Sequence, residues 1–186
     1  MRFHRLINLS NQSTKEILGF TLLILMFTSI NFSVAAQQVD LAGFNQVKTA
    51  SEKLITGGQP SKEELVLLAN SGVKNIINLR GVNEFDGFDE KQAAEALGIK
   101  YIVIPVNGAK GVTLENAEKL NQALSENNGL TMVHCASGNR AGALISIREF
   151  INNKQDAEAA LQTGEQAGMT SLKQKVSEIL QSVDNK

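Results

Sequence analysis

The sequence predicts a single α/β domain, a three-layer sandwich whose central, mostly parallel sheet has about four strands and carries helices on both faces. Two observations lead to this fold class. Short apolar runs alternate along the chain with segments whose apolar residues recur at helical spacing, which is typical of parallel strands joined by crossover helices. The length of 186 residues suffices for one domain with a substantial core.

The N-terminal residues 1–36 have the pattern of a secretory signal. A basic stretch precedes a mostly apolar run, and the small residues at 34–36 offer a cleavage site before Gln37. We therefore expect a periplasmic or secreted protein. The alternative is that the segment stays uncleaved and that residues 17–36 anchor the chain in a membrane, because about 20 apolar residues can span a bilayer.

The predicted domain covers residues 53–186 and follows a polar N-terminal segment at 37–52. Four apolar runs are expected to form strands, at residues 53–56, 73–79, 99–106 and 130–133. Helical spacing follows each strand and recurs near the C-terminus, in segments that start at residues 61, 92, 113, 140, 156 and 171. The first helix opens with a capping box formed by Ser61 and Glu64, and Gly72 ends it.

The composition excludes several classes of protein. The formal net charge is −1, and no basic patch is interleaved with aromatic residues, so no nucleic acid partner is expected. The single cysteine, Cys135, excludes an intramolecular disulfide and any zinc site built from several cysteines. His134 is the only histidine beyond the predicted signal, so the sequence implies neither a metal site nor another cofactor.

Cys135 is the centre of the predicted site. It lies where the last strand turns into the helix that starts at Arg140, and the first amides of a helix carry partial positive charge and lack intrahelical acceptors. Such a place stabilises both a thiolate and an oxyanion. Gly138 allows a tight turn that points successive amides inward, and Arg140 offers a planar fork of donors to an oxyanion. The sequence therefore predicts a nucleophilic thiolate beside an anion-binding loop.

The other residues of this loop receive supporting roles. Ala136, Ser137, Gly138 and Asn139 are expected to bind the substrate, with Ser137 near the thiolate and Asn139 at the cap of the following helix. The His134 side chain should point to the opposite side of the strand from Cys135 and support the loop by a hydrogen bond. A small anionic or phosphorylated substrate is the expected partner, and a membrane is a partner only if the N-terminal segment is uncleaved.

The loop resembles the active site of the cysteine-dependent protein tyrosine and dual-specificity phosphatases, on the residues His134-Cys135, Ser137-Gly138 and Arg140. Within that superfamily the chain is most similar to the bacterial beta-lactamase-hydrolase-like group, which shares the segments Gly58-Gln59-Pro60 and Ile77-Asn78-Leu79-Arg80. The resemblance implies a phosphatase-like fold and an exported hydrolase of phosphate monoesters. In such an enzyme the Cys135 thiolate attacks phosphorus, Arg140 and the loop amides hold the oxygens, and water resolves the thiophosphoryl intermediate.

Two departures from that family leave other functions open. The phosphatase signature has five residues between the cysteine and the arginine, whereas four separate Cys135 from Arg140. The shorter loop resembles that of rhodanese-type sulfurtransferases, in which the cysteine carries a sulfane sulfur. The relatives also carry an aspartate as general acid where this chain has Asn107, so a non-catalytic anion-binding module is the third alternative.

A substitute for the missing acid is expected in the loop at 81–90, which is rich in glycine and acidic residues. Glu84, Asp86 and Asp89 are the candidate general acids, and Glu90 is the last acidic residue of this loop. The same segment could instead be a solvated surface loop without a role at the site. Arg80, just before it, is expected either to pair with a carboxylate or to touch the substrate.

Overall fold

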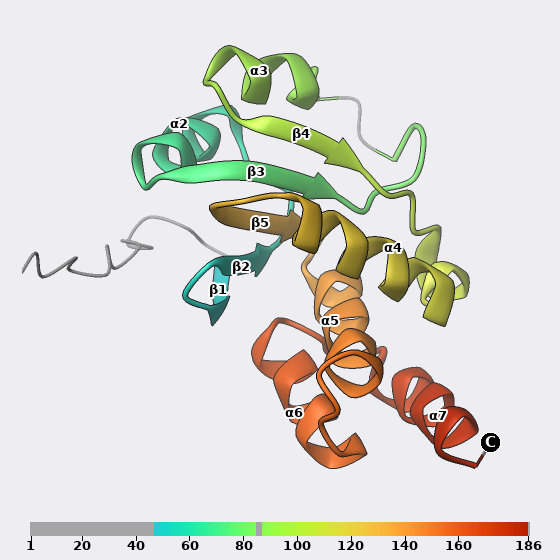
Figure 1. The fold of residues 1–186 in the computed structure, drawn as a ribbon. Helices are drawn as coiled ribbons and strands as arrows, with labels where there is room; N and C mark the ends of the chain where they lie inside the picture. Colours follow the sequence, from blue (N-terminus) through green and yellow to red (C-terminus); the bar gives the residue numbers. More distant parts are fainter. Residues whose placement is uncertain (1–46, 85–86, 186) are drawn as a thin grey trace, which may run out of the picture. The chain divides into compact units, whose positions relative to one another are not determined.

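The structure is a computed structural model that describes residues 47–84 and 87–185. In this part of the chain five strands form one sheet (Figure 1): β1 (Val47–Ser51), β2 (Leu54–Gly57), β3 (Val73–Asn78), β4 (Lys100–Val103) and β5 (Leu130–His134). The helices are α2 (Lys62–Asn70), α3 (Glu90–Ala96), α4 (Leu114–Glu126), α5 (Asn139–Ile151), α6 (Ala157–Gln166) and α7 (Lys173–Asp184), with a short 3-10 turn η1 (Gly108–Gly111) before α4.

The strand order is β1-β2-β5-β3-β4, and all neighbouring pairs are parallel except β1 with β2. The predicted α/β sandwich around a mostly parallel sheet is therefore confirmed. Strand β1 was not predicted from the sequence; it lies at the end of the segment 37–52 and pairs antiparallel with β2. Its apolar residues Val47 and Ala50 are only half-buried at the edge of the sheet, so no clear alternation marks this strand in the sequence.

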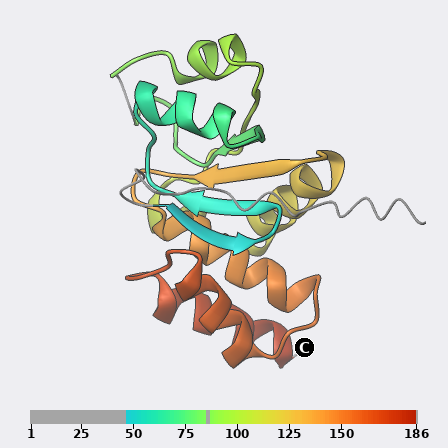
Figure 2. The same ribbon diagram turned by 90° about the vertical axis from the view of Figure 1, so that its left-hand side faces the viewer.

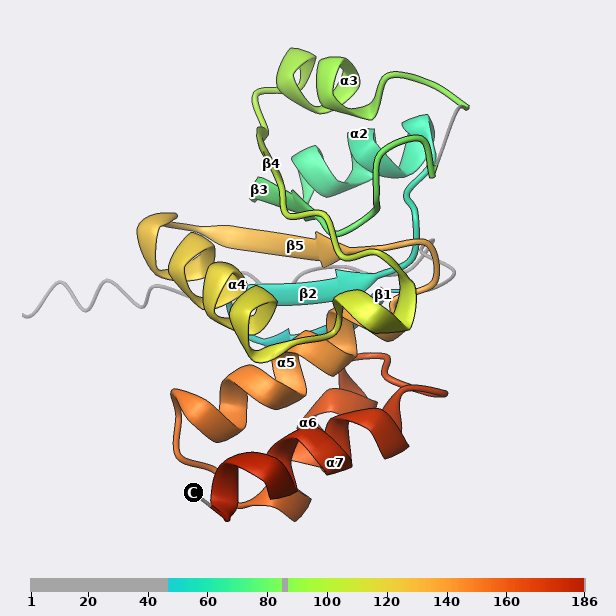
Figure 3. The same ribbon diagram turned by 90° about the vertical axis from the view of Figure 1, so that its right-hand side faces the viewer.

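The register of the strands divides their side chains between two cores. Ile55, Met132 and Ile76 lie side by side across β2, β5 and β3, and they pack against α2 and α3. Ile77 and Val133, one residue further along β3 and β5, point to the opposite face and pack against α4 and α5. Figures 2 and 3 show the two helical layers, with α2 and α3 on one side of the sheet and α5, α6 and α7 on the other.

Side-chain caps begin α2, α4 and α6 close to the predicted starts of these helices. The capping box of α2 is confirmed: Glu64 N donates to Ser61 Oγ at 3.1 Å, and Ser61 N donates to Glu64 Oε2 at 2.8 Å. Thr113 caps α4 and Asp156 caps α6 in the same way, each accepting a backbone N–H of the first turn. These local signals explain why the helix starts could be predicted closely.

Helix α5 is the central helix of its layer, and its first half is buried from Arg140 to Ile147. It crosses α6 at Gly142, where a Cβ atom would lie 2.5 Å from the carbonyl oxygen of Gly164. Two backbones can approach this closely only where side chains are absent. The crossing fixes the start of α5, and with it the loop that follows Cys135, against the rest of the domain.

The predicted signal at 1–36 and the alternative anchor at 17–36 lie outside the described residues, so both stay predictions. Among the helices of residues 47–84 and 87–185, none is both long enough and apolar enough to cross a membrane.

Candidate active site

The loop after β5 is held against the segment that follows β2. Gln59 N donates to Ala136 O at 3.2 Å, and Gly58 pairs with Ser137 in an isolated antiparallel bridge. Cys135, at the base of this loop, is only 1% exposed. The Gly58-Gln59-Pro60 segment therefore forms one wall of the loop, which gives a structural reason for its presence beside the cysteine motif.

The turn into α5 is made at Gly138, whose φ of 85° lies in the left-handed region that favours glycine. Gly138 thereby takes the cap position of α5, and the assignment of that cap to Asn139 was wrong. Asn139 is the first helical residue, and its side chain joins the loop to the connection between α6 and α7. It donates to Ser171 Oγ at 2.7 Å and accepts from Thr170 N at 2.8 Å.

Arg140 lies in the first turn of α5, and its guanidinium is held from several directions. Nη1 donates to Val106 O at 2.7 Å and to Glu84 Oε2 at 2.8 Å, and Nη2 contacts Glu84 Oε1. The hydrogen bonds to Glu84 are the main reason that the pKa of Arg140 is raised; burial opposes them, and the charge of the Cys135 thiolate adds to them. A thiolate at Cys135 would therefore favour the charged form of Arg140.

Glu84 occupies the fork of Arg140 with its own carboxylate. Its Oε2 also accepts the backbone N–H of Gly81 at 2.7 Å, so both carboxylate oxygens are engaged. The hydrogen bond from Arg140 is the chief cause that lowers the pKa of Glu84, against a smaller opposing effect of burial. Glu84 is therefore ionised in this arrangement and accepts hydrogen bonds, whereas a general acid must donate a proton.

The other candidate acids are placed differently. Asp89 Oδ1 accepts Gln92 N at 2.9 Å and caps α3, while Asp86 lies outside the described residues. Asn107, which stands where the relatives carry an aspartate, is exposed, and its Oδ1 lies against Gly81. Within the described residues, no group of three or more histidine, cysteine, aspartate or glutamate side chains is arranged to hold a metal ion.

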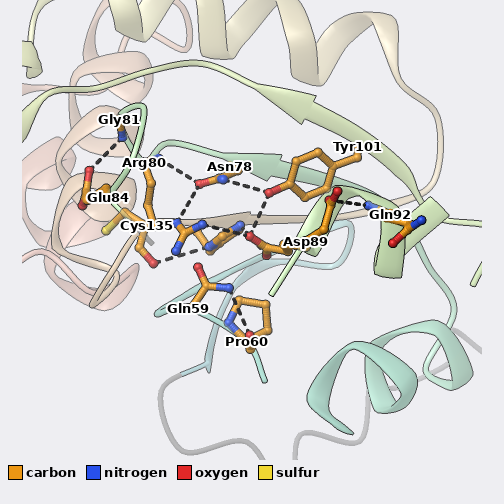
Figure 4. Close-up of polar contacts among 12 residues, drawn as sticks. Gln59, Pro60, Asn78, Arg80, Gly81, Glu84, Asp89, Gln92, Tyr101 and Cys135 are labelled. Atoms are coloured by element: carbon orange, nitrogen blue, oxygen red, sulfur yellow. Dashed lines mark hydrogen bonds and ion pairs between the residues drawn. The ribbon is translucent and has the colours of Figure 1, made fainter. Parts of the chain in front are cut away.

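His134 lies on the opposite face of the sheet from Cys135, next to Glu90. The same group of polar side chains includes Asn78, Arg80 and Tyr101, which Figure 4 shows. The Nδ1 of His134 is 3.4 Å from the carbonyl oxygen of Cys135, and its Nε2 is 3.0 Å from Glu90 Oε1. Glu90 Oε2 accepts the Tyr101 hydroxyl at 2.8 Å and the Arg80 Nη2 at 3.4 Å. Arg80 therefore pairs with a carboxylate, one of the two outcomes that the sequence left open.

Burial would raise the pKa of Glu90, but the hydrogen bond and charge of His134, with further hydrogen bonds from Tyr101 and Gln59, outweigh it and lower that pKa. Burial and the neighbouring Glu90 carboxylate raise the pKa of Tyr101. The sequence analysis assigned no role at the site to Glu90 or Tyr101. An acidic residue in the first turn of a helix is common, and a single tyrosine on a strand carries no positional signal.

The chain matches the model of the family described as DSP-PTPase phosphatase fused to NAD+ kinase, over residues 29–182. It is also 34% identical over 108 residues to the Beta-lactamase hydrolase-like protein of Xylella fastidiosa, a match that covers 56% of this chain and 25% of the relative. The matched region thus spans about a quarter of the length of that curated relative.

Solved structures show the same fold. A DUF442 protein of Shewanella putrefaciens CN-32, described as a candidate phosphatase, superposes with a TM-score of 0.62 at 22% identity, over 77% of this chain and 95% of that one. TpbA of P. aeruginosa, solved in complex with pTyr, gives a TM-score of 0.56 at 18% identity, over 75% of this chain and 86% of that one. The resemblance to cysteine-dependent phosphatases is therefore confirmed, and the chain belongs to the DSP-PTPase phosphatase family whose model it matches.

Proposed function

We propose that this protein hydrolyses phosphate monoesters through a covalent cysteine intermediate. The observation that carries the proposal is that Arg140, in the loop that follows Cys135, binds an oxyanion: its two Nη atoms hold the carboxylate of Glu84. A guanidinium fork that binds a carboxylate in this way also suits two oxygens of a phosphoryl group. The family of the chain supports the same reaction class.

In the first step the Cys135 thiolate attacks phosphorus, a sulfur–phosphorus bond forms, and the ester oxygen leaves with the bonding electrons. Arg140 and the amides of residues 136–140 hold the remaining oxygens, and water then cleaves the sulfur–phosphorus bond to release phosphate. Loss of general acid catalysis slows such reactions by roughly 10²–10⁴-fold. Because residues 107–112 contain no carboxylate, we expect aryl phosphates such as phosphotyrosine, whose leaving groups need less protonation, to react best.

A second candidate function is favoured by the length of the loop. Only four residues separate Cys135 from Arg140, so the anion-binding loop is smaller than in the family signature, which has five. A sulfurtransferase would fit it: the Cys135 thiolate attacks the outer sulfur of thiosulfate, the sulfur–sulfur bond breaks, and sulfite leaves with the electron pair. The resulting persulfide would pass its outer sulfur to an acceptor thiol, and neither step requires a general acid.

One experiment separates these functions. The full chain is incubated with an aryl phosphate or with thiosulfate, and its intact mass and the released phosphate are measured beside the Cys135→Ser variant. We expect phosphate release that the variant lacks. A mass increase of one sulfur atom after thiosulfate, without phosphate release, would replace the phosphatase by the sulfurtransferase. Neither signal, together with retained phosphate binding, would identify a non-catalytic anion-binding module.

We also infer that the protein is exported, on the basic and apolar pattern of residues 1–36. Mass spectrometry of the protein from fractionated cells tests this inference. A mature N-terminus at Gln37 in the periplasm or medium is the expected result, whereas an intact N-terminus in the membrane fraction would identify an anchor.

A further inference from the structure

We propose that Glu84 is the general base for the second half of the reaction, in which water hydrolyses the phosphoryl group on Cys135. This role rests on the phosphatase function proposed above, and it names the group that takes the proton from the water. Both carboxylate oxygens of Glu84 contact Arg140, the residue expected to hold the phosphoryl oxygens. A carboxylate and a phosphoryl group that meet at one guanidinium lie close enough for one water molecule to contact both.

The direction of attack brings water to the side of the loop that is open to solvent. Cys135 is only 1% exposed, whereas the side chain of Glu84 is 31% exposed. The attacking and leaving atoms stand in line at phosphorus, so water must approach from the side opposite to the buried sulfur. Glu84 is therefore the partner of Arg140 that this water can reach.

The turn at residues 81–84 keeps Glu84 beside the loop after a substrate has displaced its carboxylate. Glu84 N donates to Gly81 O at 3.3 Å, and Asn83 has a φ of 62°, a left-handed conformation that asparagine adopts more readily than most residues. Figure 4 shows the Glu84 side chain folded back toward Gly81, whose N donates to Glu84 Oε2 at 2.7 Å. The backbone of the turn thus fixes the distance between Glu84 and the loop independently of the contact with Arg140.

The carboxylate is in the form that a base needs. The hydrogen bond from Arg140 lowers the pKa of Glu84, and a glutamate released into water, with a pKa of about 4.3, is still ionised at neutral pH. In the proposed step a water oxygen bonds to phosphorus, the sulfur–phosphorus bond breaks, and its electrons return to Cys135 as a thiolate. The proton of the water moves to Glu84, which then loses it to solvent.

The neighbouring polar residues are placed or built in ways that do not suit this role. Asp89 caps α3, while His134 and Glu90 lie on the opposite face of the sheet from the thiol. Asn107, where the relatives carry an aspartate, has an amide side chain, which does not accept a proton from water. Within the part of the chain that the structure describes, these placements favour Glu84 as the base at the mouth of the loop.

The two half-reactions can be separated with the full-length protein and 4-nitrophenyl phosphate, whose acidic leaving group needs little protonation. For Glu84→Gln we expect a burst of nitrophenol that matches the amount of protein, followed by turnover slowed roughly 100-fold, because only hydrolysis loses its base. Intact mass after rapid denaturation should show one phosphoryl group on the variant. Glu84→Asp keeps a carboxylate and should restore part of the turnover. Glu95→Gln is the matched control, since Glu95 is 53% exposed on α3 and pairs with Lys91.

The outcomes distinguish this role from others and from the phosphatase function itself. Turnover of Glu84→Gln equal to that of the unmodified protein would overturn the proposal. Slow turnover without a burst and without a phosphoryl adduct would also overturn it, because Glu84 would then act before hydrolysis. If the unmodified protein released no phosphate at all, the phosphatase function would fail, and the role of Glu84 would fail with it.

Discussion

Two carboxylates, each close to a basic side chain, flank the cysteine loop, and they differ in their access to solvent. On the outer side Arg140 pairs with Glu84, whose side chain is 31% exposed; on the inner side His134 pairs with Glu90, and both are almost completely buried. A carboxylate that is partly exposed can be released to solvent and replaced by another anion, whereas a carboxylate buried among its partners is costly to remove. The contact of Arg140 with Glu84, here called the outer pair, is therefore exchangeable, and the contact of His134 with Glu90, the inner pair, is permanent.

The outer pair has a direct consequence for substrates. An incoming oxyanion that uses the same edge of Arg140 must displace the Glu84 carboxylate, which also gives up the N–H of Gly81. The exposure of Glu84 keeps the cost of that displacement small, since water can solvate the released carboxylate. The Glu90 carboxylate of the inner pair is not displaced by substrate. It holds the end of β5, from which Cys135 projects.

The largest expected effect comes from breaking each pair in turn. Glu90→Ala leaves Arg80 and His134 without their shared carboxylate in the core, and we expect it to lower the free energy of unfolding by ~3–5 kcal/mol. Glu84→Ala, the same truncation on the outer side, should cost no more than ~1 kcal/mol. Urea unfolding followed by circular dichroism measures both. Equal losses of unfolding free energy in the two variants would show that the difference in burial does not make the two pairs differ in their contribution to stability.

The next effect concerns the outer cation itself. Arg140→Lys keeps the positive charge but removes the planar fork, so one charge-assisted hydrogen bond to a bound oxyanion is lost. At ~1.5–3 kcal/mol for such a bond, phosphate affinity should fall by about 10- to 100-fold. Isothermal titration with inorganic phosphate tests this. An unchanged affinity would mean that the anion is held by the loop amides and not by the side chain.

The comparison also explains what the sequence could and could not predict. The parallel strands β2, β3 and β5 were visible because most of their residues are buried on both faces, which produces short runs rich in apolar residues. The helix starts could be predicted because a cap such as Ser61 is adjacent in the sequence to the helix that it begins. The edge strand β1 was missed because half-buried residues leave no such run.

In the site, Cys135, Gly138 and Arg140 lie close together in the chain, so their spacing alone indicated an anion-binding loop. The partners that set the electrostatics, Glu84 and Glu90, come from a distant segment, and only the order of strands in the sheet brings them there. Glu84 was among the expected acids because it lies in the acid-rich loop at 81–90, but its role as a hydrogen-bond acceptor follows from its contact with Arg140 and not from the local pattern.

A smaller effect is expected at the turn between the two pairs. Gly138→Ala forces a side chain into the left-handed region and toward the Gly57 backbone, and we expect a loss of ~1–2 kcal/mol together with weaker phosphate binding. Gly98→Ala is the matched control, because Gly98 has a φ of 75° with no atom within 4 Å of the added Cβ. It should lose stability through backbone strain alone and keep its phosphate affinity. Equal effects of both variants on binding would contradict a special role for the turn.

The smallest effect tests whether Glu84 competes with substrate. Glu84→Gln removes the charge that pairs with Arg140, so sulfate affinity at neutral pH should rise by about fivefold, equivalent to the ~1 kcal/mol of an exposed pair. Because the pKa of Glu84 is lowered below 4.5, the pair is fully formed above that value and is lost as the pH falls through the lowered pKa. Sulfate keeps its charge over this range, so its affinity for the unmodified protein should rise as the pH falls through that lowered pKa, and the rise should be absent in Glu84→Gln. Weaker sulfate binding by the variant would contradict the competition between Glu84 and the anion. It would mean that Glu84 orients Arg140 for the anion and that the outer pair, like the inner one, is permanent.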